Sequence, residues 1–214
     1  MDDGRGNGPM PGTTIWLVCH AADAALRAGT FPRAPDAGDN EEGHTLDARA
    51  GEAIDAWRAR WQTLLVSADA AAPHALTSPA AIARASAQAA GFAPERADAL
   101  ADAAYGAWQG RRLADVTREA PEALAAWTRD PAFRPPGGGE SFDDVRSRVA
   151  AWLDAMPEAE KTVVAFTHAP VIRAAVLHAL HAPSESFRRV EIAPLSVTVL
   201  RRTTQGWVWL ADGF

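Results

Sequence analysis

Thr14-Ile15-Trp16-Leu17-Val18, followed directly by Cys19-His20, is the stretch that decides the fold. The run is apolar, as expected of a strand whose sheet is covered on both faces. A second run of this kind, from Thr162 to Phe166, ends at Thr167-His168. Helical segments alternate with these strands. We therefore expect an α/β fold with three layers, α/β/α, around a mainly parallel central sheet.

Periodicity, caps and turns predict the other elements. Helices are expected over 46–65, from Ser78 as N-cap to about Ala90, over 111–129 with a break at Pro121, from Val145 to Met156, and after Pro170 to about His181. Further strands are expected at 75–77, 196–201 and 207–210. Gly29 to Gly43 is predicted to be a long loop, and long loops in compact domains often act as functional lids. Trp207 and Trp209 share one face of the last strand, which would be core or a homodimer surface.

Length and composition restrict the class of protein. The 214 residues fit one domain, predicted over 13–214 after a disordered leader at 1–12. The 21 basic against 27 acidic residues give a net charge of −6, which argues against nucleic-acid binding through overall positive charge. The single cysteine excludes an internal disulfide and a multi-cysteine metal site. No apolar run approaches the ~20 residues that cross a bilayer, and no signal peptide is recognised, so we expect no membrane partner and a cytoplasmic location.

Two histidines follow the two buried strands. Ligands of parallel α/β sheets bind beyond the carboxyl ends of the strands, where His20 and His168 are expected. The helix that starts near Ala169 would direct backbone N–H groups at the same place, which suits an anion such as phosphate. One imidazole can attack phosphorus and a second can stabilise charge, while a carboxylic acid protonates the leaving alkoxide. The two rings should therefore converge on one anion pocket.

The residues around these histidines resemble a known family. Leu17-Val18-Cys19-His20-Ala21 is similar to the Leu-Val-Arg-His-Gly motif of the histidine phosphatase superfamily, phosphoglycerate-mutase-like branch. Further similar segments follow in the family's order: Leu46-Asp47, Thr77-Ser78-Pro79, Asp102 to Gly110, Gly138-Gly139-Glu140-Ser141, and Thr167 to Arg173. The resemblance covers Thr13 to about Arg202, nearly the whole chain.

The resemblance implies a phosphomonoester hydrolase that acts on a small phosphorylated substrate through a phosphohistidine, with no metal or other cofactor. Carried over by position, His20 is the nucleophile, His168 is the second imidazole, and Asp102 is the acid in place of the family's glutamate. A mutase is less expected than a phosphatase, because the segment between Asp102 and His168 is too compact for the mutases' insertion.

Two departures concern the grip on the phosphoryl group. The family places arginines where this chain has Cys19 and Ile82, and neither substitute matches the bidentate hydrogen bonding of a guanidinium. We take Cys19, Ala169 and Arg33 as the phosphate-binding candidates, with Arg33 as the preferred substitute cation because its loop follows the nucleophile. The alternative is a catalytically inactive relative that binds a phosphorylated ligand or a protein partner. Cys19 as a thiolate nucleophile and a metal site of His20, His168 and Asp102 are less favoured interpretations.

Overall fold

The computed structural model describes residues 12–33, 46–65, 72–157 and 162–211. Its helices are α1 (Ala24–Arg27), α2 (Ala48–Leu65), α3 (Ala81–Ala89), α4 (Leu113–Glu119), α5 (Pro121–Arg129), α6 (Phe142–Asp154) and α7 (Ala169–Ala179). Its strands are β1 (Thr14–Cys19), β2 (His74–Thr77), β3 (Glu95–Arg96), β4 (Thr162–Thr167), β5 (Val197–Thr203) and β6 (Gly206–Leu210). Short 3-10 turns lie at Asp98–Leu100, Gly106–Trp108 and Ser184–Arg189. The predicted leader and most of the Gly29–Gly43 loop lie outside the described residues.

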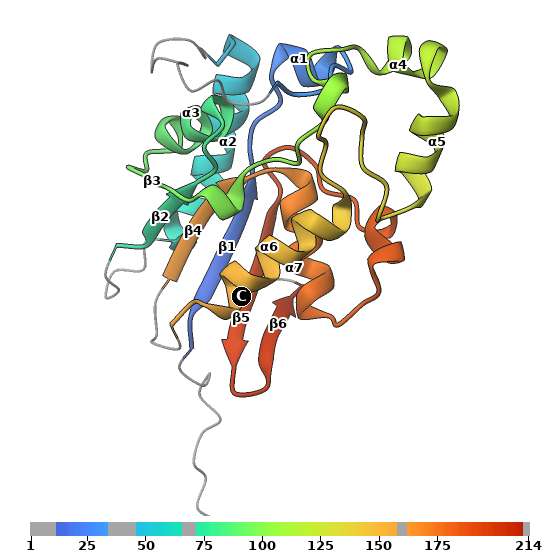
Figure 1. The fold of residues 1–214 in the computed structure, drawn as a ribbon. Helices are drawn as coiled ribbons and strands as arrows, with labels where there is room; N and C mark the ends of the chain where they lie inside the picture. The colour runs from blue at the N-terminus through green and yellow to red at the C-terminus, as the bar shows by residue number, and fades with distance from the viewer. Residues whose placement is uncertain (1–11, 34–45, 66–71, 158–161, 212–214) are drawn as a thin grey trace, which may run out of the picture.

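The strands form one sheet in the order β3-β2-β4-β1-β5-β6. The pairs β3–β2, β2–β4 and β4–β1 are parallel, whereas β5 and β6 are antiparallel to their neighbours. The mainly parallel sheet predicted from the buried strands is thus confirmed. Figure 1 shows β1 and β4 side by side in the middle of the sheet, with α6 and α7 in front of it.

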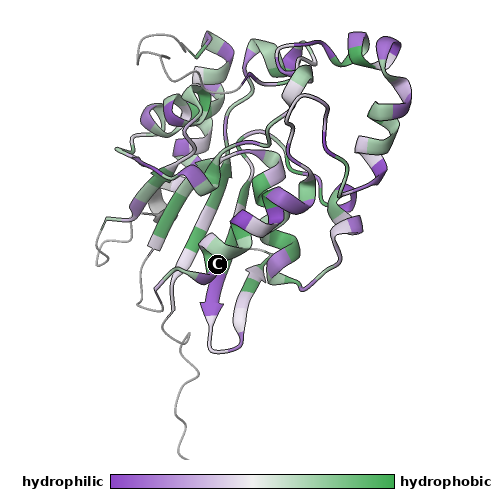
Figure 2. Ribbon diagram, viewed as in Figure 1, coloured by the Kyte–Doolittle hydropathy of each residue, from purple (hydrophilic) through white to green (hydrophobic). Residues whose placement is uncertain are grey.

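Side chains of β1 alternate between two cores, which explains why the strand is apolar throughout. Ile15, Leu17 and Cys19 pack with α6 and α7 on one face of the sheet. Trp16 and Val18 pack with α2 and α3 on the other. In Figure 2 the hydrophobic colour runs along β1 and β4 at the centre of the sheet. Because β1 and β4 are parallel and in register from Thr14–Thr162 to Cys19–Thr167, both strands end at the same edge of the sheet.

The start of α3 differs from the prediction. The sequence predicts Ser78 as an N-cap with Pro79 as the first helical residue, whereas α3 begins at Ala81 with Ala80 as its N-cap. The Ser78 hydroxyl accepts from the Ala80 N–H at 3.1 Å and is also bonded to His168, so Ser78-Pro79 form the turn before the helix. In α6, Ser141 is the N-cap and forms a capping box with Asp144, so this helix begins at Phe142, ahead of the predicted Val145.

The last strand presents different surroundings to its two tryptophans. Trp207 is 6% exposed and packs in the core with α6 and α7, whereas Trp209 is 44% exposed on the edge strand β6. Trp207 is therefore a core residue, as one of the two predicted alternatives has it. The homodimer surface stays a prediction. Within the described residues no helix combines the length and the apolar character required to cross a bilayer.

Candidate active site

His20 and His168 lie side by side at the carboxyl edge of the sheet. Cys19 and Thr167, the last residues of β1 and β4, are paired in the parallel register, and each is followed directly by a histidine. The His20 N–H donates to the Thr167 carbonyl at 2.9 Å, which locks the two strand ends together. The two ring centroids are 4.8 Å apart with an interplanar angle of 65°. The predicted closeness of the two rings is therefore confirmed, and the anion pocket between them stays a prediction.

The ring of His20 is held with one nitrogen available. Its Nδ1 lies 2.8 Å from the Ala21 carbonyl, and because a carbonyl can only accept, Nδ1 carries the proton of the neutral ring. Nε2 then keeps its lone pair. Burial lowers the pKa of His20 to about 4, and the neighbouring His168 acts in the same direction. At neutral pH His20 is consequently an uncharged imidazole with a free Nε2, the form that a nucleophile requires.

His168 is the N-cap of α7 and is 2% exposed. Its Nε2 is 2.8 Å from the Ser78 hydroxyl oxygen. Its Nδ1 faces Asp102 Oδ2 at 3.5 Å, within the range of an ion pair but longer than a hydrogen bond, and this nitrogen is buried without a hydrogen-bond partner. Burial lowers the pKa of His168 to about 3, with the positive charge of Arg148 as the second cause. This ring is therefore also neutral at pH 7.

The backbone around Asp102 is held near the imidazoles by hydrogen bonds from Arg148, which the sequence does not predict. The guanidinium of Arg148, on α6, donates to the carbonyls of Ala99, Ala101 and Asp102 at 2.7, 2.8 and 3.1 Å. Glu140 pairs with Arg148 at 3.0 Å and accepts from the Ala104 N–H at 3.1 Å. Glu140, from the Gly-Gly-Glu-Ser segment, thus helps to hold the backbone that carries Asp102.

The carboxyl group of Asp102 is buried enough to change its chemistry. Burial raises its pKa from 3.8 to about 6, although the Ala103 N–H donates to Oδ1 at 2.8 Å and lowers it. Tyr105, 8% exposed, lies close enough for its hydroxyl to lower the pKa of Asp102 by hydrogen bonding. A carboxylic acid with a pKa near 6 can hold a proton at mildly acidic pH and release it to a leaving group.

This raised pKa has a consequence for stability. A folded pKa above the unfolded value means that stability is fully present below about pH 4 and is lost as the pH rises through about 6. The shift corresponds to up to about 3 kcal/mol. We expect Asp102→Asn to raise the free energy of unfolding at pH 8 by up to about 3 kcal/mol and to leave it unchanged near pH 3.5. Urea unfolding at both pH values measures this, with the exposed Asp98→Asn as control. A less stable Asp102→Asn protein at pH 8 would contradict the account.

The phosphate-binding candidates occupy different surroundings. Cys19 is 4% exposed, and burial raises the pKa of its thiol to about 12, so that it is no thiolate at neutral pH. Ala169 is the first residue of α7, where opening N–H groups lack intrahelical acceptors. Arg33 is exposed and lies against Gly110; no contact with the imidazoles is found among the described residues. Ile82 is buried on α3.

A second arginine, Arg173, interacts electrostatically with residues of the site. Arg173 is half-buried on α7, and its Nε–H donates to the Val190 carbonyl at 2.7 Å. Burial lowers its pKa, while Tyr105, Cys19 and Asp102 are among the groups that act in the opposite direction. Within the described residues no carboxylate lies within ion-pair distance of Arg173. The sequence contains Arg173 in a family-like segment, but gives no signal of its electrostatic interaction with Cys19.

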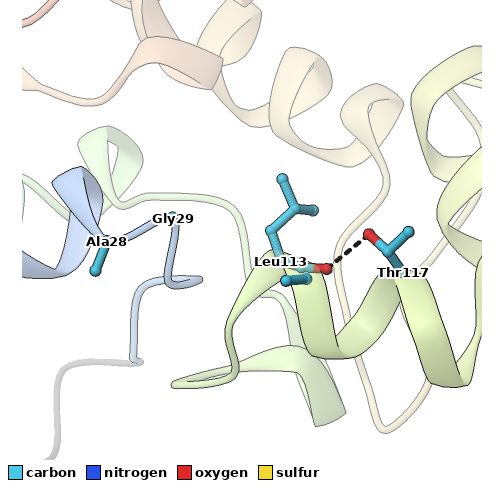
Figure 3. Close-up of a pocket in the computed structure, with 5 residues that line it drawn as sticks. Ala28, Gly29, Leu113 and Thr117 are labelled. Carbon is cyan, nitrogen blue, oxygen red and sulfur yellow. Dashed lines mark hydrogen bonds between the residues drawn. The ribbon is translucent and has the colours of Figure 1, made fainter.

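An open pocket of about 520 Å³ lies between α1 and α4 and is lined by Ala28, Gly29, Leu113, Ala114 and Thr117; Figure 3 shows these lining residues. Its lining contains no ionisable side chain, and the Thr117 hydroxyl donates to the Leu113 carbonyl at 2.8 Å. The chemistry therefore lies with the histidines and not here. Among the described residues no group of three or more His, Cys, Asp or Glu is arranged to hold a metal ion.

Comparisons with solved structures show the same fold. The "Mycobacterial hydrolase 1" structure is 20% identical, with a TM-score of 0.75 over 92% of this chain and 96% of that one. A phosphoserine phosphatase mutant from Entamoeba histolytica, in complex with phosphoserine, is 12% identical with a TM-score of 0.73 over 93% and 95%. The TTHB049 protein from Thermus thermophilus is 25% identical with a TM-score of 0.64 over 92% and 99%.

Curated relatives match only part of the chain. "Bifunctional protein Rv2228c" of Mycobacterium tuberculosis and "Uncharacterized protein Mb2253c" of Mycobacterium bovis are each 33% identical over 104 residues. The match covers 48% of this chain and 28% of each relative, so the chain spans less than a third of the relatives' length in that match.

The family model for the histidine phosphatase superfamily (branch 1) matches residues 15–212, which include both strand ends, both imidazoles and Asp102. With nearly the whole chain matched, this protein belongs to the histidine phosphatase superfamily, as the order of its motifs predicts.

Proposed function

We propose that this protein is a phosphomonoester hydrolase that works through a phosphohistidine on His20. The observation that carries the proposal is the pair of neutral imidazoles, with ring centroids 4.8 Å apart, beside a carboxyl group whose pKa is about 6. One ring has a free Nε2 for attack, and the acid needed by the leaving group faces the other ring at 3.5 Å. The phosphoserine phosphatase and hydrolase among the similar structures support the same class of reaction.

In the first step the lone pair of His20 Nε2 attacks phosphorus, the P–N bond forms, and the bond from phosphorus to the ester oxygen breaks. Asp102 in its protonated form gives its proton to the departing alkoxide. In the second step the Asp102 carboxylate takes a proton from water, whose oxygen attacks the phosphohistidine. The P–N bond then breaks, inorganic phosphate leaves, and both His20 and Asp102 return to their starting states.

The grip on the phosphoryl oxygens is where this chain departs from the family. Cys19 and Ile82 are both buried and neither offers a charged donor. Each lost charged hydrogen bond is worth roughly 1.5–3 kcal/mol, equivalent to about a 10- to 100-fold loss of rate if it acts in the transition state. This observation favours a second candidate function: an inactive relative that binds a phosphorylated ligand or protein partner.

Cys19→Arg, alone and combined with Ile82→Arg, separates a weakened enzyme from a binding protein. If the lost clamp limits turnover, we expect each arginine to raise kcat/KM for an aryl phosphate by about tenfold or more. Initial rates of phenolate release measure this, with Cys19→Ser as a control of similar size and no charge. Unchanged or lower rates in folded variants would show that the missing arginines do not limit turnover.

The remaining cations are tested by Arg33→Ala and Arg173→Ala. Arg33 is proposed from its loop after the nucleophile, and Arg173 from its electrostatic interaction with Cys19 and Asp102. We expect Arg173→Ala to weaken inorganic phosphate binding and to raise KM by about tenfold, and Arg33→Ala to have the smaller effect. Isothermal titration with phosphate and steady-state kinetics measure both, with the exposed Arg96→Ala as control. A larger loss in Arg33→Ala would reverse the assignment.

The proposed function is tested directly with an aryl phosphate and rapid quenching. We expect acid-labile phosphate to appear on His20 at up to one equivalent, followed by slower release of inorganic phosphate. Labelling without turnover would identify an impaired enzyme. Neither labelling nor turnover, with retained binding of a phosphate ester, would establish the binding function instead.

A further inference from the structure

Ser78 is a buried polar residue that the proposed mechanism does not use. It stands in the turn between β2 and α3 and is 1% exposed. Its hydroxyl oxygen makes two contacts, with the Ala80 N–H at 3.1 Å and with His168 Nε2 at 2.8 Å. Ser78 contacts His168, which in turn faces Asp102, as the serine, histidine and aspartate do in the catalytic triad of a serine hydrolase. However, Ser78 is closed to substrate, and its oxygen already accepts from the backbone, so it is unsuited to nucleophilic attack.

The two contacts of Ser78 decide where its proton goes. The backbone N–H of Ala80 can only donate, so the hydroxyl oxygen accepts there. The hydroxyl proton then needs an acceptor, and the acceptor found for it among the described residues is the lone pair of His168 Nε2. The opposite arrangement, with the proton on Nε2, would leave the buried hydroxyl proton without a partner, which carries a desolvation cost.

The surroundings of His168 Nδ1 favour the same position of the ring proton. His168 Nδ1 lies 3.5 Å from Asp102 Oδ2 and is buried with no hydrogen-bond partner. A proton on Nδ1 is attracted by the carboxylate, whereas a lone pair at that position would be repelled by it. Because burial keeps this ring neutral, it carries one proton, and both neighbours place that proton on Nδ1.

We propose that Ser78 is a positioning residue that fixes His168 in the neutral tautomer protonated at Nδ1. The ring thereby presents an N–H donor on the side of Asp102, where the transferring phosphoryl group would lie. The catalytic role rests on the proposed function, whereas the tautomer itself does not. A neutral donor held in this way stabilises negative charge on the phosphoryl oxygens without a cation at that position.

Nitrogen-15 NMR of the labelled protein at pH 7.5 tests the tautomer directly. Long-range proton–nitrogen correlation spectra distinguish a protonated ring nitrogen from one with a lone pair, and the His168 signals are identified by their absence in His168→Gln. We expect wild-type His168 to show a protonated Nδ1 and an unprotonated Nε2. The proton on Nε2 in the wild-type spectrum would overturn the proposal, and this measurement needs no variant of Ser78 and no substrate.

The role of Ser78 is tested by Ser78→Ala and Ser78→Thr. We expect the alanine variant to lose the pure Nδ1–H tautomer and the threonine variant, which keeps a hydroxyl, to retain it. Ser86→Ala is the matched control for the spectra. Ser86 is also fully buried, and its hydroxyl serves the Ala21 N–H and the Ile82 carbonyl instead of an imidazole. An unchanged tautomer in Ser78→Ala would show that Ser78 does not set it.

Kinetic measurements test the catalytic role of Ser78 separately from its effect on the tautomer of His168. We expect Ser78→Ala to lower kcat for an aryl phosphate by at least about tenfold with little change in KM, and Ser78→Thr to restore most of the loss. If the wild-type protein has no phosphatase activity, the proposed function fails while the tautomer result still stands or falls by its spectrum. A changed tautomer with unchanged kcat would overturn the catalytic role of this positioning.

Discussion

Replacement of His20 by alanine is expected to lower kcat for an aryl phosphate by about 10⁴-fold or more and to abolish acid-labile phosphate labelling. The reason is that Nε2 of His20 is the free imidazole nitrogen at the carboxyl edge of the sheet, and a lost nucleophile removes the covalent route altogether. Initial rates and labelling with radioactive phosphate ester provide the measurement. The expected residual rate is close to that of the reaction without enzyme.

A matched control is available in the same sheet. His74 begins β2, and its half-exposed side chain lies 3.3 Å from Glu95, at the opposite end of the strand from the edge that carries His20 and His168. His74→Ala should therefore retain full turnover and labelling. Persistent labelling of His20→Ala at a stoichiometry like that of the wild type would place the nucleophile elsewhere and remove the basis of the proposed reaction.

Asp102→Asn is expected to lower kcat by about 10²- to 10⁴-fold for an alkyl phosphate, whose leaving alkoxide needs a proton. The loss should be much smaller for nitrophenyl phosphate, because nitrophenolate leaves without protonation. In the wild-type protein kcat/KM for the alkyl ester should fall as the pH rises through about 6, where Asp102 loses its proton. It should also fall as the pH drops through about 4, where His20 gains one. In Asp102→Asn the fall of kcat/KM above about pH 6 should be absent.

Comparison of the two esters distinguishes an acid from a structural carboxylate. Equal losses for alkyl and nitrophenyl phosphate would mean that Asp102 holds the site in shape and does not donate a proton. Asp98→Asn, in the same segment and exposed beside Arg96, is the control for a charge change there. It should leave the rates for both esters unchanged.

The sequence predicted the central strands and the place of His20 and His168 at their ends, because both depend on residues that are neighbours in the chain. A strand buried on both faces requires a continuous apolar run, and β1 and β4 each have one. A parallel register then carries the residues after the two runs to the same edge, so the sequence alone could place His20 and His168 together. Asp102 was instead predicted from the resemblance of its segment to a family motif, and its carboxylate lies 3.5 Å from His168 Nδ1.

Other parts of the site depend on contacts that are distant in the chain. Arg148 fixes the backbone around Asp102 across 46 residues, and Ser78 reaches His168 across 90. Neither contact leaves a periodic signal, because its partners are far apart in the chain. The start of α3 was mispredicted for this reason: the hydroxyl that a local pattern assigns to a helix cap also bonds to the imidazole.

What the sequence determined by itself is therefore the family, the layered fold and the candidate nucleophile, because periodicity and motif order are properties of neighbouring residues. Only the tertiary structure decided the protonation states on which the chemistry depends. Burial moves the pKa of both rings and of Asp102, and the proposed proton positions rest on the contacts with the Ala21 carbonyl and the Ser78 hydroxyl. Desolvation and hydrogen-bond geometry arise only when distant segments pack together, so they have no counterpart in the order of the residues.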